Sequence, residues 1–462
     1  MDNSTLLFDL PASSSREIIA RFDGGDLSSD AGLLLVAQAD ERIGLTAAMA
    51  DTLSERRQKS KIRFDILTLL RERIYAIAAG YEDCNDLDTL RDDPALRVAC
   101  RSDLDDVSAL ASQPTLSRFE NAVPWRDLVR LGTLLAQRVV AQLPADTKHV
   151  YFDLDATVDP CHGQQELCLY DGHAGTQCYL PLLGFVTDET GKQRLMGALL
   201  RSAVGRSTKG NMTFLRMGVR ILRERFPSLQ ITVRGDCGFG YGRLINWCEK
   251  MHVDYLLGVP PNPVLLAKAS WAQMEAAVWA RFHPVGYRVF DEWQHQANSW
   301  KQPCRLIVKA EAQGDIIDTR FVVTSHKEST GKEVYGNYTQ RGDIENRIKE
   351  FKLDLQCGRT SCHRFLANQF RLLLHHGAAI LTQLLQQALE GTAYARAQVS
   401  TLRLRLLKVA ARVQVSCRKI WFHLPTAFPL QSIWRTLIVR LRAGPLSANC
   451  MNNPDRVSDL ET

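Results

Sequence analysis

Residues 149–157 read His-Val-Tyr-Phe-Asp-Leu-Asp-Ala-Thr, and the pattern of the chain changes at this stretch. Before it, apolar residues cluster as they do in helices, whereas this stretch is strand-like. It carries two carboxylates, Asp153 and Asp155, and period-two alternation places both on the same face. We therefore predict a strand here that presents acidic side chains near its end.

Further elements follow in a recognisable order. Strands are predicted over 178–188, 193–202, 230–234 and 254–259, and helices over 208–226 and 243–252. The order strand-strand-strand-helix-strand-helix-strand is the ribonuclease H-like arrangement, an α/β sheet with helices on its faces. Active groups in open sheets of this kind gather at strand ends. Asp236 ends the fourth strand and is a second candidate.

The rest of the chain surrounds this core. We predict a helical N-terminal domain, a core in two parts separated by a β-rich insertion, and a basic helical C-terminal tail. The N-terminal domain spans 1–145 and the tail spans 391–462. The two parts of the core span 146–260 and 336–390, and the insertion between them spans 261–335.

Composition excludes several classes of protein. Apolar residues make up 45% and charged residues 23%, as in globular proteins with a sizeable core. The apolar stretches are too short to span a bilayer, and the first residues do not resemble a secretory signal. The twelve cysteines include no CxxC pair, which argues against a disulfide framework or a zinc ribbon. We therefore expect a reduced, cytoplasmic location without membrane partners.

Charge is distributed unevenly along the chain. Residues 1–120 carry 22 acidic and 14 basic side chains, whereas residues 391–442 carry ten Lys or Arg and no Asp or Glu. Such a basic stretch favours binding of a polyanion, because it displaces condensed counterions. A solvated basic helix face is the alternative interpretation.

A predicted helix over 336–358 presents a stripe of four functional groups. At about 100° per residue, Tyr338, Arg341, Glu345 and Lys352 fall within an arc of about 60°. An arginine can grip a phosphate with two hydrogen bonds, and a lysine acts as a point charge. The stripe therefore suits a DNA backbone beside a metal-binding carboxylate. An ordinary amphipathic helix with a Glu345–Lys349 pair is the alternative.

Metal-dependent phosphodiester cleavage explains why carboxylates are needed at several places. It requires an activated water and a stabilised leaving oxygen, and two Mg²⁺ ions about 3.5–4 Å apart provide both. Such ions take carboxylate oxygens from different elements. Asp155, Asp236 and Glu345 are the candidate catalytic and metal-binding residues. Asp153 competes with Asp155, and Asp236 alone could be a turn cap.

The spacing Tyr338-x2-Arg341-x3-Glu345-x6-Lys352 resembles the Y-R-E-K signature of bacterial insertion-sequence transposases of the DDE class. The blocks around the two aspartates, and two further blocks near the N-terminus, are similar to the same family. These blocks span 153–166, 233–239, 80–86 and 113–118, and the resemblance covers about residues 20–440.

The resemblance implies a DNA transposase that cuts transposon ends and transfers the strand into target DNA. By it, the three carboxylates form the catalytic triad with two Mg²⁺ ions, Mn²⁺ being a possible substitute. Tyr338, Arg341 and Lys352 contact the phosphates of the transposon end. Double-stranded DNA, namely terminal inverted repeats and target, is the expected partner of a homodimer associated with the bacterial nucleoid. Cut-and-paste movement through a DNA hairpin is implied in the same way.

The resemblance also gives the insertion a role. Relatives use a tryptophan there to stack on a flipped base near the cleaved end. Trp300 is the candidate, with Trp293 behind it. A core role for the tryptophans of the insertion is the alternative.

A second DNA contact is predicted in the N-terminal domain. Thr115 follows a turn at Pro114 and is a plausible N-cap, which places Arg118 near a helix start. This could be the recognition helix of a helix-turn-helix unit, or only a capped helix.

Two other functions fit the same residues. One is a ribonuclease H-like nuclease that cuts DNA without strand transfer. The other is a transposase-derived DNA-binding protein that has lost catalysis, although all three carboxylates are present.

Overall fold

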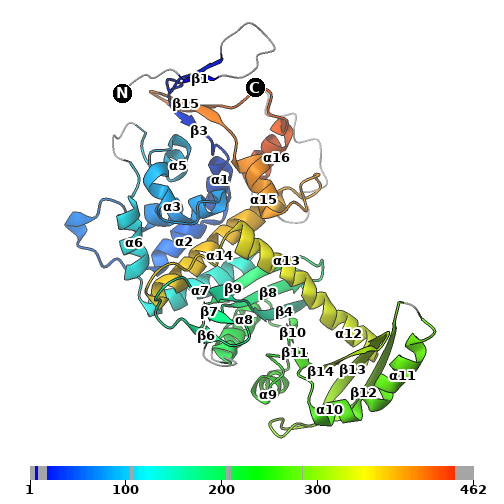
Figure 1. Ribbon diagram of the computed structural model, residues 1–462. Helices are drawn as coiled ribbons and strands as arrows, with labels where there is room; N and C mark the ends of the chain where they lie inside the picture. Colours follow the sequence, from blue (N-terminus) through cyan, green and yellow to red (C-terminus); the bar gives the residue numbers. More distant parts are fainter. Residues whose placement is uncertain are drawn as a thin grey trace. The chain divides into compact units, whose positions relative to one another are not determined.

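The computed structural model describes residues 6–8, 18–104, 109–203, 208, 210–283 and 285–442. The chain forms two compact units, coloured along the sequence in Figure 1. Unit 1 comprises Met1–Ala50, Glu55–Phe119 and Leu381–Gly444, and unit 2 comprises Asp51–Ser54, Glu120–Ile380 and Pro445–Thr462. The predicted C-terminal segment lies outside the described residues from 443 onward.

Unit 2 is a mixed α/β fold around an eight-stranded mixed sheet, with strand order β12-β13-β14-β11-β10-β4-β8-β9. β10 pairs in parallel with both β4 and β11, whereas β8 and β9 continue the sheet antiparallel. The predicted order of strands and helices is present. Its elements are β4 (His149–Ala156), β8 (Leu182–Asp188), β9 (Gln193–Leu199), α8 (Asn211–Arg225), β10 (Gln230–Gly235), α9 (Gly242–Met251) and β11 (Asp254–Val259).

The insertion extends this same sheet. β14 (Ile316–Thr324) pairs antiparallel with β11, and β13 (Cys304–Gln313) and β12 (Tyr287–His295) continue outward. Helix α11 (Ser270–Ala280), preceded by α10 (Pro263–Lys268), contacts these strands. The insertion is therefore β-rich, as predicted, but its strands belong to the central sheet (Figure 1).

Alternation along β4 gives its two faces different partners. Phe152 is fully buried and its ring stacks on Phe214 of α8 at 6.3 Å. Tyr151 packs on the other face, against a buried cluster that includes Val334 of α12 (Gly331–Thr339). Asp153 and Asp155 share the Tyr151 face. Arg234, which pairs with Asp153, also lies over the Tyr151 ring, so this contact agrees with the predicted face of Asp153.

The predicted helix over 336–358 is part of a longer helical run. The run consists of α12 (Gly331–Thr339), a 3₁₀ turn (Gln340–Asp343), α13 (Ile344–Lys349) and a π turn (Glu350–Asp354). Thr330 and Glu333 form a capping box at its start, which satisfies free backbone N–H groups. The tight and wide turns change the regular 100° step on which the predicted stripe was based.

A small three-stranded sheet follows β4. β5 (Asp159–Pro160) and β6 (Leu169–Asp171) flank β7 (Thr176–Tyr179). Cys161 follows β5 and Cys168 precedes β6, and the two form a disulfide. This disulfide differs from the reduced cysteines expected from the sequence, in which the seven-residue spacing of the two gave no sign of the pairing.

Helices dominate the sequence before β4 and after β14. Those before β4 are α1 (Leu33–Ile43), α2 (Leu45–Thr52), α3 (Ile66–Ala79), α4 (Asp86–Leu90), α5 (Pro94–Ala99), α6 (Gln113–Ala122) and α7 (Trp125–Val140). Three short strands lie near the N-terminus, β1 (Leu6–Phe8), β2 (Ile18–Ala20) and β3 (Leu27–Ser28), with a 3₁₀ turn at Lys59–Lys61. The prediction of Thr115 as an N-cap is wrong, because α6 begins two residues earlier.

The C-terminal region is only partly helical, which corrects the predicted helical tail. After α14 (Phe365–Ala388), α15 (Val399–Leu402) and a π turn (Arg403–Leu407), the chain forms a hairpin of β15 (Ala411–Ser416) and β16 (Lys419–His423). Helix α16 (Gln431–Arg442) follows. Among the helices in the described part of the chain, none combines the length and apolar character needed to cross a membrane.

Candidate active site

Asp155 lies at the end of β4 beside a guanidinium group. Its Oδ2 is 3.2 Å from Nη1 of Arg341, and its Oδ1 accepts the backbone N–H of Ala156 at 2.9 Å. Burial raises the pKa of Asp155 to about 6; Arg341 opposes this rise, and the negative charges of Asp236 and Glu345 add to it. The three predicted carboxylates are thus close enough to interact electrostatically.

Asp236 is placed by the register between two parallel strands. Gly235 of β10 pairs with Leu154 of β4, so the residues that follow, Asp236 and Asp155, occupy neighbouring positions. Adjacent strands run about 4.8 Å apart. The Oδ1 atom of Asp236 accepts the backbone N–H of Gly238 at 2.9 Å, which fixes the turn after the strand. The carboxyl ends of the two central strands therefore present neighbouring acids.

Asp153 has a different environment from Asp155. It is fully buried, and its two oxygens accept from Nε and Nη2 of Arg234 at 2.6 and 2.8 Å. Arg234 also donates to the carbonyl of Asn337 on α12 at 2.9 Å, and its guanidinium lies 4.1 Å from the ring centroid of Tyr151. This pair links β4, β10 and α12 in the interior. Asp153 thus forms a buried structural ion pair, whereas Asp155 is partly accessible to solvent.

The helical run 331–354 brings three of its predicted residues to this region. The pKa of Tyr338 is raised by burial, with a further rise from Asp236 and an opposing effect of Arg341, which places its phenol near both. Lys352 donates from Nζ to the carbonyl of Val158 at 2.6 Å, just beyond β4. Glu345 is exposed on α13. The run therefore lines the ends of β4 and β10.

Gly258 of β11 lets Tyr338 approach the sheet. A Cβ atom at this position would lie 2.7 Å from the Tyr338 hydroxyl oxygen and 2.8 Å from the backbone nitrogen of Cys237. Both distances are shorter than side-chain carbons tolerate. The glycine is thus required by close packing at the site.

The donor set fits a hard divalent cation in kind, because such cations take carboxylate oxygens. Within the described ranges, however, no three His, Cys, Asp or Glu groups stand close enough together to hold a metal ion. Arg341 lies on Asp155, and Glu345 is exposed. The carboxylates are neighbours without forming a complete coordination shell.

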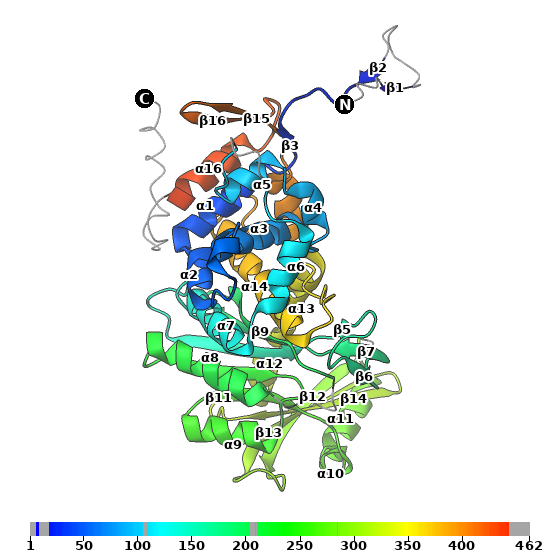
Figure 2. The same cartoon turned by 90° about the vertical axis from the view of Figure 1, so that its left-hand side faces the viewer.

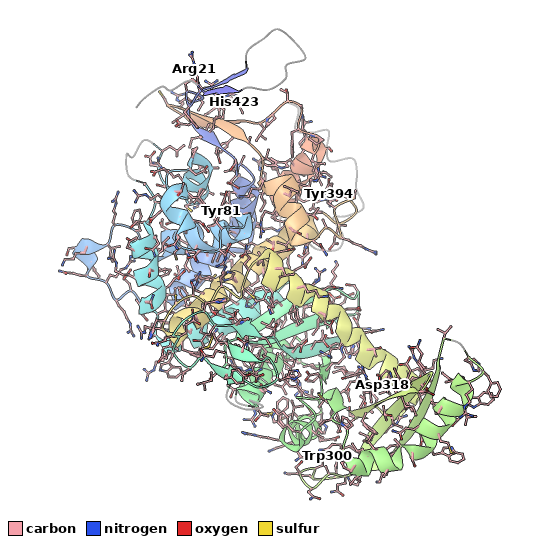
Figure 3. All side chains as sticks on the ribbon, in the orientation of Figure 1. Arg21, Tyr81, Trp300, Asp318, Tyr394 and His423 are labelled. Atoms are coloured by element: carbon pink, nitrogen blue, oxygen red, sulfur yellow. A yellow bond between two sulfur atoms is a disulfide. The ribbon has the colours of Figure 1, made fainter. Side chains whose placement is uncertain are left out.

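Two other predicted DNA contacts, Trp300 and Arg118, have their own surroundings. Trp300 is only 5% exposed, and its ring packs edge-on against His295 at 5.5 Å (Figure 3 labels Trp300). Stacking on a base would require this ring to leave its packing. Trp293 is half-buried, with its ring 6.4 Å from that of Phe321. Arg118 is exposed on α6 in unit 1.

A pocket of about 680 Å³ lies beside the start of the helical run, on β12–β14 and α12. Lys309 is buried within it and pairs with Glu311 at 2.7 Å and Asp318 at 3.2 Å, the latter labelled in Figure 3. Arg288 and Arg320 pair with the same two acids. The polar wall of the pocket is thus a charge-paired network across the strands.

Asp159 is a site residue that the sequence analysis did not single out. It is 2% exposed, and its Oδ2 accepts from the Thr360 hydroxyl at 2.7 Å. Its Oδ1 is buried without a hydrogen-bond partner among the described residues. Burial raises its pKa to about 7, opposed by Thr360 and by the charge of Lys352. Its position four residues after Asp155 was the only signal in the sequence.

A family of known proteins matches most of this chain. The family model described as "Transposase DDE domain group 1" matches residues 10–446, and the chain belongs to this family. A piggyBac transposase synaptic complex with hairpin DNA, solved by cryo-EM, is similar at 13% identity and a TM-score of 0.38, over 90% of this chain and 83% of that one. A search of curated proteins found no match.

Proposed function

We propose that this protein is a DNA transposase of the Y-R-E-K group, which cleaves transposon ends and transfers the strand into target DNA. The observation that carries the proposal is the neighbouring position of Asp155 and Asp236 at the ends of parallel strands, with Arg341 on Asp155. Glu345 follows Arg341 on the same helical run and contributes to the charge around Asp155. Membership of the transposase family supports the same reading. A ribonuclease H-like description of the core fits its strand order.

Each residue has a defined task in this proposal. Asp155, Asp236 and Glu345 would hold Mg²⁺ or Mn²⁺, which when bound supplies an activated water and charge stabilisation at the leaving oxygen. Arg341 binds the scissile phosphate through its planar donor fork, and Lys352 adds a point charge. Tyr338 orients the phosphate with its hydroxyl group. Arg341 must exchange Asp155 for a phosphate when DNA binds.

The partners follow from the same proposal. The substrate is double-stranded DNA with terminal inverted repeats, and the second substrate is target DNA. A homodimer would pair two ends, and the protein would work in the bacterial cytoplasm at the nucleoid.

Strand transfer is the reaction that tests the proposal. Purified protein is incubated with pre-cut, labelled end DNA, a target plasmid and Mg²⁺, and joined products are resolved on a denaturing gel. We expect joined product from the parent and at least a 10³-fold loss with Asp236→Asn, as is typical of removing an essential catalytic group. A parallel reaction with uncut end DNA reports cleavage, and cleavage of that substrate without joining of the pre-cut one would establish a nuclease. Binding without either reaction would establish a non-catalytic DNA-binding protein.

A further inference from the structure

The hairpin of β15 and β16 is an exposed two-stranded ribbon in unit 1. β15 pairs with β16 from Arg412↔His423 to Ser416↔Lys419, and the two strands are joined by Cys417 and Arg418. The third strand, β3, pairs only with Ala411 and Arg412. All residues from 414 to 421 are exposed. Beyond its base the ribbon therefore has no strand partner within the described residues, and Figure 2 shows it extending past the helices of its unit.

One face of the ribbon combines cations with an aromatic ring. Residues directly opposite each other, and residues two apart, share a face. By the register this face carries Arg412, Gln414 and Ser416 from β15, and Lys419, Trp421 and His423 from β16. Trp421 is 48% exposed, the Lys419 ammonium lies 5.2 Å from its ring centroid, and the His423 ring stacks on it at 6.3 Å (Figure 3 labels His423).

Two cations on this face of the ribbon have no ion pair, unlike some others of the basic C-terminal stretch. Residues 391–442 contain no acidic side chain. Lys408 is paired with Asp30 at 2.7 Å, and Arg440 donates to the carbonyls of Ala388 and Glu390. Arg412 and Lys419 have no ion pair within the described residues. A polyanion could therefore bind them without breaking an internal ion pair.

We propose that the β15–β16 ribbon binds duplex DNA, with its cationic face in or across the major groove. This inference rests on the proposed function. A two-stranded ribbon fits the major groove, which is about 12 Å wide. Arg412 and Lys419 stand four residues apart along the ribbon, about 13 Å at 3.3 Å per residue. They can reach phosphates on opposite rims, while Gln414 and Trp421 lie between them above the base edges.

Salt dependence of DNA binding tests the ribbon in the full-length protein. Each phosphate contact contributes a slope of about −0.9 in a plot of log affinity against log salt concentration. Fluorescence anisotropy with a labelled duplex compares the parent with Arg412→Ala/Lys419→Ala. We expect about tenfold weaker binding and a slope shallower by about 1.8 units for two lost contacts. Arg412→Lys should keep the slope, because it keeps the charge.

A matched control removes two charges elsewhere in the same unit. Lys59 and Lys61 are exposed, so Lys59→Ala/Lys61→Ala changes the net charge equally. An unchanged slope in the ribbon variant, or an equal change in the control, would overturn the inference. Cleavage of end DNA is measured in parallel. If the parent cleaves and the ribbon variants bind DNA as tightly as the parent does, the role of the ribbon is refuted and the proposed catalytic function is not. An Asp236→Asn protein that still cleaves refutes the catalytic assignment, while its salt slope still reports on the ribbon.

Discussion

Nη1 of Arg341 lies 3.2 Å from Oδ2 of Asp155, so a residue expected to bind phosphate contacts a residue expected to bind metal. Both side chains are largely shielded from water, with 16% and 15% of their surfaces exposed. In the free protein the guanidinium balances part of the negative charge that two neighbouring acids create. In the proposed complex, a DNA phosphate would replace Asp155 as the partner of Arg341, and a metal ion would replace Arg341 as the partner of Asp155.

Replacing Arg341 should therefore impair catalysis strongly. We expect Arg341→Ala to reduce end cleavage about 10²-fold, the usual cost of removing one donor that stabilises a transition state. Arg341→Lys should be intermediate, since it keeps the charge but loses the planar fork. Single-turnover cleavage at saturating DNA gives the rates. Arg347→Ala is the control, because Arg347 lies on the same run and pairs with Glu350 at 2.6 Å. Equal losses in both variants would contradict a specific role for Arg341.

Asp153 and Asp155 should respond in opposite ways to the same substitution. Asp153→Asn leaves Arg234 buried and without its charged partner, and breaking a buried pair costs about 3–5 kcal/mol. Asp155→Asn should not lower the free energy of unfolding, because burial already disfavours the charged carboxylate, as its raised pKa shows. It should nevertheless abolish cleavage. Urea unfolding and end cleavage are measured for both. If Asp153→Asn were stable and inactive while Asp155→Asn stayed active, the assignment of the two residues would be reversed.

The central features of the fold could be predicted from periodicity. Alternation over 149–157 predicted the face on which Asp153 lies, and the order of strands and helices after it is confirmed. Periodicity could not show which of the two aspartates forms a buried ion pair, because the partner of Asp153, Arg234, lies 81 residues away in the sequence. Such a pairing depends on the parallel alignment of β4 and β10, which only the folded chain reveals.

Other features required contacts that local sequence does not specify. The sequence Ala411-Arg-Val-Gln-Val-Ser416 alternates as a strand does, whereas the predicted tail is helical throughout. Trp300 was chosen for its residue type, and its burial depends on packing against His295. The insertion was recognised as β-rich, whereas its pairing with β11 through β14 was not foreseeable.

Gly258 should be intolerant of even the smallest side chain. Gly258→Ala places a methyl group where the Tyr338 hydroxyl and the Cys237 backbone now lie. We expect end cleavage to fall about tenfold or more, because a displacement of about 1 Å in a positioned group has large effects on rate. Gly336→Ala on α12 is the matched control, since its new Cβ would meet nothing within 4 Å. That variant should be slightly more stable, by up to about 1 kcal/mol, and fully active. Loss of activity in both variants, or in neither, would contradict the steric argument.

Asp159 should make the stability of the protein depend on pH. Burial raises its pKa to about 7, whereas the pKa of an aspartate in the unfolded chain is about 3.9. Between these values the folded state binds the additional proton, so this group's contribution to stability falls as pH rises from about 4 to about 7. Above about pH 7 the destabilisation of the folded state by the ionised Asp159 is constant, and below about pH 4 there is no such destabilisation. Asp159→Asn removes the titration and keeps an oxygen that can accept from Thr360.

The free energy of unfolding of Asp159→Asn minus that of the parent should therefore increase from pH 4 to pH 7 and then level off. The total increase should be between about 1 and 4 kcal/mol, since each unit of pKa shift corresponds to about 1.4 kcal/mol. Urea titrations at several pH values measure this difference, in which the titration of all other groups largely cancels. Thr360→Val serves as the control, because it removes the hydroxyl donor and should raise the pKa of Asp159 further. A difference that is flat with pH, or one that decreases, would show that Asp159 is ionised in the folded protein over this range.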